Sequence, residues 1–353
     1  MTTFTSIERL LGQVPGELTM LLREIDRAQG RQEAFRIQHP QRLDVLTRVA
    51  RIESTEASNE IEGITAPHAR IEALVAETTT PRNRSEEEIA GYRKVLDVIH
   101  STAPDSIPFT VNVVKQFHGS LYEFAAGRGG EFKVTDNEVI EELPDGTRAL
   151  RFTPVPAWRT AEEMRQLHDG FAAATVSGRY HPLLLTGSYV LDFLVIHPFS
   201  DGNGRMARLL TLLLLYTGGY QVGRYISLEQ VIAETKETYY EALGASTVGW
   251  HEDAHDPEPW LRYFLGVVIA AYRRFEERGA GLAGRGSKGE AVRHFIRSSL
   301  SDEFTIADIR RAAPGVSDDH IRKVLAALRA DGVVEGASRG RSAKYRRLRT
   351  DFD

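Results

Sequence analysis

The sequence predicts a mainly α-helical fold with one small β-hairpin and a separate C-terminal domain. Two apolar segments, Leu183–Ile196 and Arg205–Thr217, flank a short polar loop and have the length of buried helices. Residues 139–152 instead are typical of two short strands joined by a Pro-Asp-Gly turn at residues 144–146. A glycine-rich stretch at residues 279–287 has the composition of a linker and separates this body from the end of the chain.

Four regions are therefore expected. They are an N-terminal helical region, a larger helical domain, a linker and a C-terminal domain, at residues 1–84, 85–278, 279–287 and 288–353. In the first region, apolar residues recur at helical spacing from Leu43, and Gly63 is expected to end that helix.

The composition excludes several classes of function. The 353 residues contain no cysteine, which rules out thiolate catalysis, cysteine zinc sites and a disulfide framework. The formal net charge of -5 is mild and identifies no partner. The first residues lack the pattern of a signal peptide, and the longest apolar stretch, residues 263–272, is too short to cross a bilayer. A soluble, cytoplasmic protein with no membrane contact is therefore expected.

The polar loop between the two apolar helices has the sequence HPFSDGNGRMAR, residues 197–208. Pro198 disfavours helical geometry at His197, so the first helix is expected to end there and to present the imidazole at its terminus. Gly202 and Gly204 allow backbone N–H groups to turn toward a ligand. The second helix is expected to begin at about Gly204, so its positive dipole end points to the same place.

Charged side chains complete this loop. Asp201 provides a carboxylate able to hold Mg²⁺, and Arg205 and Arg208 add positive charge near the first turn of the second helix. Taken singly, a histidine before proline and a Gly-Asn-Gly turn are more often structural. Taken together with the imidazole of His197, these groups predict a phosphate cradle beside a base, which is the equipment of phosphoryl or nucleotidyl transfer.

The loop resembles the signature of Fic domains, H-P-F-x-D-G-N-G-R-x-x-R, at every fixed position. Residues 181–183 (HPL) and 237–243 (ETYYEAL) are also similar to the family pattern. The resemblance implies a Fic-type helical bundle with a β-hairpin flap. It also implies a protein adenylyltransferase, which moves AMP from ATP to a Ser, Thr or Tyr hydroxyl of a protein.

The resemblance implies a role for each loop residue. His197 would be the general base that takes the proton of the target hydroxyl. Asp201 would bind a Mg²⁺ ion that bridges the α- and β-phosphates. Gly202, Asn203 and Gly204 would form the anion hole for the α-phosphate.

Further roles follow from the same resemblance. Arg205 would meet the β-phosphate, and Arg208 would pair with the γ-phosphate. Tyr240, or its neighbour Tyr239, would line the adenine pocket. The hairpin at residues 139–152 would be the flap whose exposed strand edge aligns an extended target peptide by β-addition.

An acidic helix end in the N-terminal region points to regulation. Ser58 and Glu62 are four residues apart and share one helix face. With Gly63 they resemble the inhibitory motif of Fic proteins, S/T-x-x-x-E-G/N. The resemblance implies that Glu62 pairs with Arg208 and occupies the γ-phosphate position. Some family members use this glutamate to remove AMP instead, so a de-AMPylase is an open alternative.

The C-terminal region is expected to hold three helices followed by a basic hairpin. The helices are predicted at residues 290–300, 304–312 and 317–331, the last with Ser317 as N-cap. This order resembles a winged helix-turn-helix. Between residues 336 and 350 there are basic residues and no acidic one, which suits phosphate contact, although Asp318 and Asp319 open the helix that would face DNA. A DNA-binding regulator with a sensory Fic domain is therefore the alternative from another class.

ATP and a protein target are the expected partners. The sequence does not identify the target, which can be the chain itself, and it leaves homodimer formation open.

Overall fold

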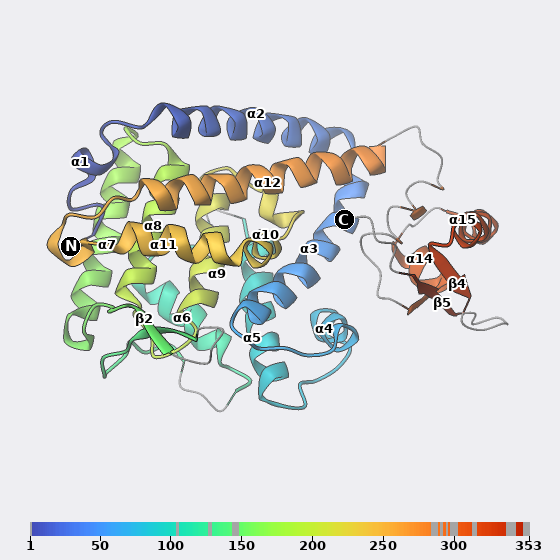
Figure 1. Cartoon of the computed structure of the whole chain (residues 1–353), viewed down its shortest axis with the longest axis horizontal. Coiled ribbons are helices and arrows are strands. Elements are labelled where there is room, and N and C mark those ends of the chain that lie inside the picture. The colour runs from blue at the N-terminus through green and yellow to red at the C-terminus, as the bar shows by residue number, and fades with distance from the viewer. Residues whose placement is uncertain are drawn as a thin grey trace. The chain divides into compact units, whose positions relative to one another are not determined.

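The structure, a computed structural model, is mainly helical (Figure 1). It describes residues 2–103, 106–125, 129–142, 148–283, 303–312, 316–336 and 344–348, with Gly289, Val292, Arg293 and Ile296. Two compact units are present. Residues 1–31 and 50–272 form the first unit, and residues 32–49 and 273–353 form the second.

The helices and strands have the following bounds in chain order, with η marking a 3-10 helix: α1 Ile7–Leu11, α2 Gly16–Gln38, α3 Pro40–Ile61, α4 His68–Val75, α5 Arg84–Ser101, α6 Val111–Leu121, β1 Val139–Glu142, β2 Arg148–Phe152, α7 Ala157–Ser177, α8 Pro182–Ile196, α9 Asn203–Thr217, η2 Val222–Arg224, α10 Leu228–Glu234, α11 Lys236–Thr247, η3 Trp250–Glu252, α12 Glu258–Ala283, β3 Glu303–Thr305, α14 Ile306–Ala312, α15 Asp318–Ala330, β4 Val334–Gly336 and β5 Lys344–Arg347.

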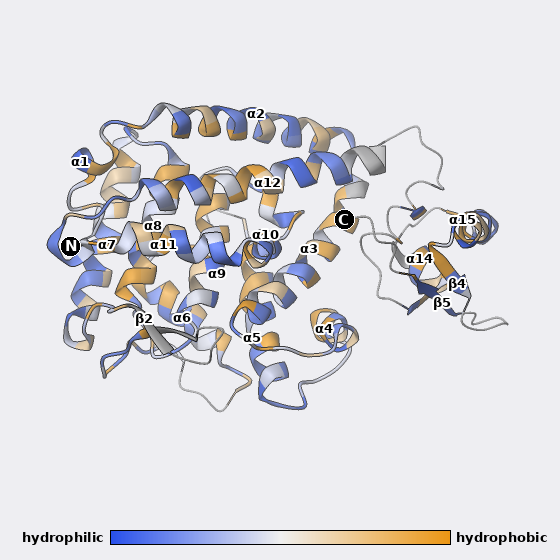
Figure 2. Ribbon diagram, viewed as in Figure 1, coloured by the Kyte–Doolittle hydropathy of each residue, from blue (hydrophilic) through white to orange (hydrophobic). Residues whose placement is uncertain are grey.

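The core of the first unit is built around α8 and α9. Every residue of α8 from Leu183 onward is buried, and in α9 every residue from Asn203 to Tyr216 except Gly204 is buried. The pair contacts α5, α6, α7 and α11 as well as each other. A helix that is apolar on all sides belongs inside a protein, and the two buried helices predicted around the loop are confirmed. By contrast, α2 alternates hydrophobic and hydrophilic residues along its length, as a half-buried helix does (Figure 2).

The predicted hairpin is also present. Strands β1 and β2 pair in antiparallel fashion, with an irregularity between Val139 and Ile140. β2 contacts α11. The predicted turn at residues 144–146 lies outside the described residues.

Helix α3 ends as its glycine predicts. Gly63 has a φ of 75°, and Ile64 N–H donates to the carbonyl of Asn59 at 3.0 Å. A left-handed residue followed by such a bond closes a helix C-terminus, and glycine adopts this conformation without a steric penalty. The chain therefore leaves α3 directly after Glu62.

The C-terminal part of the second unit contains an antiparallel sheet in the order β3-β5-β4. Its buried core is formed by Val292 and Ile296, which precede the sheet, and by residues of the sheet, α14 and α15: Phe304, Ile309, Ile321, Val324, Leu325, Leu328 and Val334. Ser317 caps α15 as expected, through its bond to His320 N–H.

One boundary in this region differs from the sequence prediction. A helix beginning at Phe304 is wrong, because Phe304 is in β3 and pairs with Tyr345, and α14 begins at Ile306. Thr305 and Asp308 form the junction, since Asp308 accepts hydrogen bonds from the backbone N–H and the hydroxyl of Thr305. Most of the predicted helix at residues 290–300 lies outside the described residues.

None of the helices in the described ranges combines the length and the hydropathy that a bilayer crossing requires.

Gly91 marks the closest approach of α5 to α6 and gives a test of this packing. A methyl group on Gly91 would lie 1.9 Å from the carbonyl oxygen of Leu121. We expect Gly91→Ala to destabilise the protein by about 1–3 kcal/mol, since one backbone must move away from the other. The measurement is the midpoint of thermal unfolding followed by circular dichroism.

The matched control is Gly266→Ala in α12, where nothing lies within 4 Å of the added methyl group. This change should leave the midpoint unchanged or raise it, because alanine favours a helix interior by about 1 kcal/mol over glycine. Equal midpoints for Gly91→Ala and the parent would contradict the packing described here.

Candidate active site

The loop between α8 and α9 begins at a strained helix end. His197 has φ 49° and ψ 61°, a left-handed conformation that is uncommon for histidine, and its N–H still donates to the carbonyl of Phe193 at 2.9 Å. Pro198 follows and prevents another helical turn. The side chain of His197 is therefore the last one that α8 presents.

The imidazole of His197 has a defined hydrogen-bonding role. Its Nδ1 lies 3.1 Å from the carbonyl oxygen of Leu194. A carbonyl can only accept, so Nδ1 carries the hydrogen and Nε2 is left with its lone pair. Nε2 is the nitrogen that can take a proton from another group.

Burial keeps this imidazole neutral. It lowers the pKa of His197 from 6.5 to about 4, and the positive charge of Lys133 acts in the same direction. The carbonyl of Leu194 and the carboxylates of Glu62 and Asp201 oppose this shift only in part. At neutral pH the ring is consequently a free base.

The side chain of Asn203 locks the loop rather than facing a ligand. Its Oδ1 accepts from Phe199 N–H at 2.9 Å, and its Nδ2 donates to the Phe199 carbonyl at 2.8 Å. Only the backbone N–H of Asn203 remains for the anion hole predicted at residues 202–204. The N–H of Gly202 also has a partner, the Asp201 carboxylate at 2.7 Å.

The first turn of α9 supplies the anion-binding end of the site. Gly202 precedes α9 and has a φ of 75°. The N–H of Met206 donates a hydrogen bond to the carbonyl of Gly202, which is the first bond of the helical pattern. The N–H groups of residues 203–205 are those that a helix start leaves without a helical partner. Together with the helix dipole they favour a negative group at this place.

Lys133 and Asn137, which precede the loop in the sequence, form hydrogen bonds to its backbone. Lys133 Nζ donates to the carbonyl of Ile196 at 3.1 Å and to Asn137 Oδ1 at 2.8 Å, and Asn137 donates in turn to Phe199. Burial lowers the pKa of Lys133 to about 8. The ammonium thus sits at the C-terminal end of α8, where a positive charge is favoured.

His118 of α6 supports the other side of the loop. Its ring stacks on Phe199 with centroids 3.7 Å apart. Gly130 N–H donates to its Nδ1 at 2.8 Å, so Nε2 carries the hydrogen and donates to the Asp201 carbonyl at 3.0 Å. Burial lowers the pKa of His118 to about 4, which keeps this arrangement uncharged.

These supporting residues were missed in the sequence. Each of them lies 62 to 83 residues before the residue with which it forms its hydrogen bond, and no rule of sequence spacing predicts such contacts. A lone histidine in the apolar helix α6 is the only signal, and such a residue is more often part of a core than of a site.

Asp201 fits a Mg²⁺ site that a nucleotide would complete. Its side chain is 66% exposed at the mouth of the loop. Among the described residues there is no group of three or more His, Asp or Glu side chains that could hold a metal by themselves. Mg²⁺ is usually held by one or two carboxylates together with substrate phosphates, so a single exposed carboxylate suits this ion.

Arg205 lies in the wall of the site rather than in its opening. Its side chain is 1% exposed, with Nη1 2.8 Å from Glu88 Oε2 and Nη2 donating to the hydroxyl of Tyr122 at 2.9 Å. Asp201 Oδ2 is 4.0 Å away. The guanidinium therefore joins α9 to α5 and to the end of α6, and its contact with a β-phosphate stays a prediction.

Arg208 meets the two residues of the predicted inhibitory motif. Its Nε donates to Ser58 Oγ at 2.8 Å, and its Nη2 donates to the Ser58 carbonyl at 2.8 Å and to Glu62 Oε1 at 2.7 Å. The side chain of Arg208 is 4% exposed and that of Glu62 is 34% exposed. The structure thus brings together residues that are 146 to 150 positions apart in the sequence.

The Glu62 carboxylate also covers the start of α9. A Cβ atom on Gly204 would lie 2.2 Å from Glu62 Oε1, so the carboxylate rests directly on the first turn of that helix. Only a residue without a side chain allows this approach. Glu62 consequently occupies the place where α9 would receive an anion.

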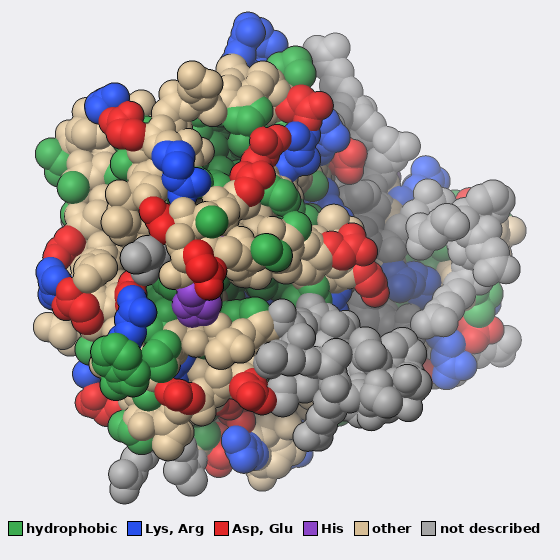
Figure 3. Space-filling view, turned by 60° about the vertical axis from the view of Figure 1, so that its left-hand side comes forward, with side chains coloured by type: hydrophobic (Ala, Val, Ile, Leu, Met, Phe, Trp, Pro, Cys, Tyr) green, Lys and Arg blue, Asp and Glu red, His purple; other side chains and the backbone are tan. Residues whose placement is uncertain are grey.

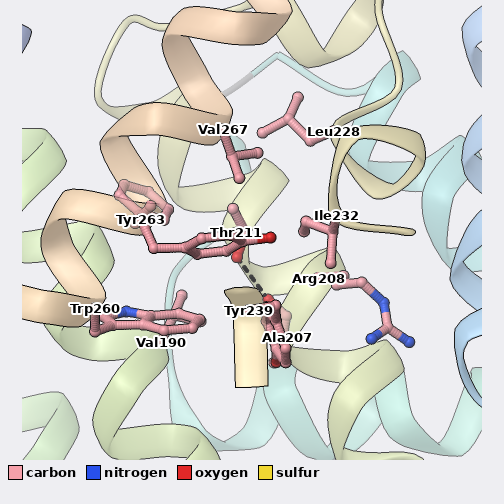
Figure 4. A pocket seen from close by; sticks show the side chains of 11 residues that line it. Val190, Ala207, Arg208, Thr211, Leu228, Ile232, Tyr239, Trp260, Tyr263 and Val267 are labelled. Atoms are coloured by element: carbon pink, nitrogen blue, oxygen red, sulfur yellow. Dashed lines mark hydrogen bonds between the residues drawn. The ribbon is translucent and has the colours of Figure 1, made fainter. Parts of the chain in front are cut away.

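A mostly apolar pocket, open in part to solvent, adjoins Arg208 (Figure 4). It is lined by Val190, Ala207, Arg208, Thr211, Leu228, Ile232, Tyr239, Trp260, Tyr263, Phe264 and Val267. In Figure 4 the Arg208 guanidinium projects away from the aromatic rings. Of the two adjacent tyrosines considered from the sequence, Tyr239 lines this pocket, whereas the ring of Tyr240 packs edge-on against that of Tyr239, with centroids 5.0 Å apart, and is not among the lining residues.

Comparisons with known proteins agree with this geometry. Residues 108–215 match the model of the Fic/DOC family. The chain is 24% identical over 216 residues to a protein named protein adenylyltransferase Fic from Nematostella vectensis, which covers 58% of this chain and 44% of that one. It is 28% identical over 208 residues to the protein of that name from Culex quinquefasciatus, covering 58% and 37%. The chain thus spans less than half the length of these relatives.

Solved structures show the same fold. A Fic family protein from Desulfovibrio desulfuricans G20 superimposes with a TM-score of 0.62 at 21% identity, covering 97% of this chain and 98% of the other. Fic-1 from C. elegans, residues 134–508, superimposes with a TM-score of 0.59 at 19% identity, covering 74% and 72%. The match to the Fic/DOC family thus covers the loop, all of α8 and α9 as far as residue 215.

Proposed function

We propose that this protein transfers AMP from ATP to a hydroxyl group of a protein, and that Glu62 restrains the reaction by occupying Arg208. One observation carries the proposal. The neutral imidazole of His197 stands beside a helix start that the Glu62 carboxylate covers, and this carboxylate is paired with the buried cation of Arg208. The names of the relatives, which are protein adenylyltransferases, support the same activity.

The reaction follows from this arrangement. His197 Nε2 takes the proton of the target hydroxyl, whose oxygen attacks the α-phosphorus of ATP. The bond from that phosphorus to the bridging oxygen breaks, and pyrophosphate leaves with the electron pair. The N–H groups at the start of α9 stabilise the charge on the α-phosphate oxygens. Mg²⁺ at Asp201 would neutralise the charge of the phosphates.

The hairpin β1–β2 is the proposed docking edge for the target. The ring of Phe152, at the end of β2, lies 6.2 Å from the ring of His197. A peptide that adds to an exposed strand edge would pass close to the base.

The alternative of a DNA-binding regulator gains no support from the C-terminal sheet. Two of the three basic residues of β5 face acidic ones, since Arg346 pairs with Glu303 at 2.7 Å and with Glu335 at 3.6 Å, and Lys344 lies 3.9 Å from Glu303. On the face shown in Figure 3, the described acidic and basic side chains are intermingled. The winged helix, a homodimer and a cytoplasmic location stay predictions from the sequence.

Replacing Glu62 tests the proposed function. We expect Glu62→Gly to increase AMP incorporation on the order of ten- to a hundredfold, because a charge-assisted hydrogen bond that competes with the γ-phosphate is worth about 1.5–3 kcal/mol. The measurement is transfer of label to protein, including the chain itself, from ATP labelled at the α-phosphate. ATP labelled at the γ-phosphate should give no labelled protein.

Two variants control this experiment. Glu60→Gly removes an exposed carboxylate from the same end of α3, and its activity should match that of the parent. Glu62→Gly combined with His197→Ala should lose the gained activity. Equal labelling by Glu62→Gly and the parent would refute the inhibitory role of Glu62, and labelling from the γ-phosphate would refute AMP transfer.

The pH dependence of the Glu62→Gly variant tests the base. The folded pKa of His197 is depressed to about 4, so the imidazole stays neutral as the pH falls from 7 to 5. We expect kcat/KM, which reports the free enzyme, to lose its His197-dependent activity only toward pH 4 rather than near 6.5. A fall in kcat/KM with its midpoint near pH 6.5 would show that the His197 ring is not desolvated as described.

The lowered pKa of His197 also makes the free energy of unfolding depend on pH. An unfolded chain binds a proton at this histidine below pH 6.5, whereas the folded chain does not until about pH 4. The contribution of His197 to the free energy of unfolding therefore falls as the pH is lowered between these values. Circular dichroism at each pH of the rate measurement separates loss of the base from loss of the fold.

A further inference from the structure

Two carboxylates face the guanidinium of Arg205, and they differ in exposure. Glu88 belongs to α5, its side chain is 6% exposed, and its Oε2 lies 2.8 Å from Arg205 Nη1. Asp201 belongs to the loop, its side chain is 66% exposed, and its Oδ2 lies 4.0 Å from Arg205 Nη2. The arginine therefore has a buried anion on one side and the predicted Mg²⁺ ligand on the other.

Burial decides with which of the two Arg205 pairs. The side chain of Arg205 is 1% exposed, so its charge is costly unless an anion lies close to it. Glu88 supplies this anion and is buried almost as deeply as the arginine. Asp201 keeps most of its hydration, and an ion pair with an exposed carboxylate contributes little.

Tyr122 engages the other end of the guanidinium. Its hydroxyl accepts a hydrogen bond from Arg205 Nη2 at 2.9 Å, and this is the nitrogen that faces Asp201. A Cβ atom on Gly202 would lie 2.9 Å from the same hydroxyl oxygen, so the tyrosine stands directly against the loop. The nitrogen that could approach Asp201 is thus already used.

Asp201 is oriented by its own loop rather than by the arginine. Its Oδ1 accepts a hydrogen bond from Gly202 N–H at 2.7 Å. This neutral donor leaves the carboxylate its negative charge, which is what attracts Mg²⁺. A direct ion pair with Arg205 would neutralise that charge and occupy Oδ2.

We infer that Glu88 is a positioning residue of the magnesium site, because it retains the Arg205 guanidinium in the wall and so leaves the Asp201 carboxylate available to Mg²⁺. The inference rests on the proposed function, in which Mg²⁺ accompanies ATP at Asp201. Glu88 touches neither the nucleotide nor the metal in this scheme. Without its charge the buried cation would need another anion, and Asp201 is 4.0 Å away.

This role predicts an effect on Mg²⁺ that a loss of packing would not produce. Loss of the Glu88 charge should draw Arg205 to Asp201 and reduce the gain in ATP affinity that Mg²⁺ provides. Binding of ATP without Mg²⁺ should not weaken, because a neutralised Asp201 repels the phosphates less. Disturbed packing around Arg205 would weaken ATP binding with and without the metal.

The experiment is isothermal titration calorimetry of the full chain with ATP, in excess Mg²⁺ or in EDTA. The reference is Glu62→Gly combined with His197→Ala, which opens the site and prevents transfer during the titration. The quantity compared is the ratio of the Kd in EDTA to the Kd in Mg²⁺. We expect Glu88→Gln in this background to lower the ratio by about tenfold, because Mg²⁺ must then displace a charge-assisted hydrogen bond between Arg205 and Asp201.

Two further variants test the route of the effect. Tyr122→Phe keeps the ring, removes the acceptor of Arg205 Nη2 and should lower the ratio in the same direction. It also serves if circular dichroism shows that Glu88→Gln does not fold. Asp201→Asn gives the ratio without the metal ligand, and adding Glu88→Gln to it should change the ratio no further.

The matched control is Arg84→Ala in the reference background. Arg84 Nε donates to the other oxygen of the same carboxylate, Glu88 Oε1, at 3.0 Å, and its side chain is 80% exposed. The change removes a partner of Glu88 without touching Arg205, and an exposed pair of this kind contributes little. The ratio should therefore equal that of the reference.

The outcomes separate the two proposals. An unchanged ratio in both Glu88→Gln and Tyr122→Phe overturns the positioning role and leaves the proposed function standing. Equal weakening of ATP binding with and without Mg²⁺ gives such an unchanged ratio. A further fall when Glu88→Gln is added to Asp201→Asn also overturns the role, since the effect then does not pass through Asp201. If the reference binds no ATP in either condition, the proposed function itself fails, and this inference fails with it.

Discussion

The reversal of the chain between two buried helices is the constraint on which the site depends. α8 and α9 are buried on nearly all sides, so the loop that joins them cannot drift without disturbing the core. His197 adopts a left-handed backbone conformation where α8 ends. The side chain of Asn203 forms two hydrogen bonds with the backbone of Phe199. A base and a helix start are thereby fixed within one tight turn, and such fixed groups need no reorganisation when charge develops.

Several polar groups are buried around this turn, and each has a partner that explains its burial. His118 donates a hydrogen bond to the carbonyl of Asp201, and Lys133 donates one to the carbonyl of Ile196. Arg205 is paired with Glu88. Arg208 differs, because one of its direct partners, the Glu62 carboxylate, is a third exposed. The site therefore combines buried supports with one ion pair that is partly open to solvent.

The sequence was sufficient for the parts of the fold that depend on local rules. Apolar helices around a polar loop, the hairpin and the glycine after α3 are confirmed, because hydrophobic periodicity and glycine conformations act over a few residues. It failed at Phe304, where pairing with Tyr345, far along the chain, decides between strand and helix. Local rules also could not distinguish between the adjacent Tyr239 and Tyr240, and only packing placed Tyr239 in the wall of the pocket beside Arg208. A role of either tyrosine in binding adenine stays a prediction.

What the sequence determined by itself is the chemistry of the loop: which residues carry charge, which lack a side chain and where a helix must stop. The tertiary structure decided which of these groups are buried and which groups they contact. It turned the amide of Asn203 and the guanidinium of Arg205 inward, and it brought Ser58 and Glu62 to Arg208. The physical reason is that burial and long-range hydrogen bonds depend on neighbours in space, which separations of up to 150 residues along the chain do not reveal.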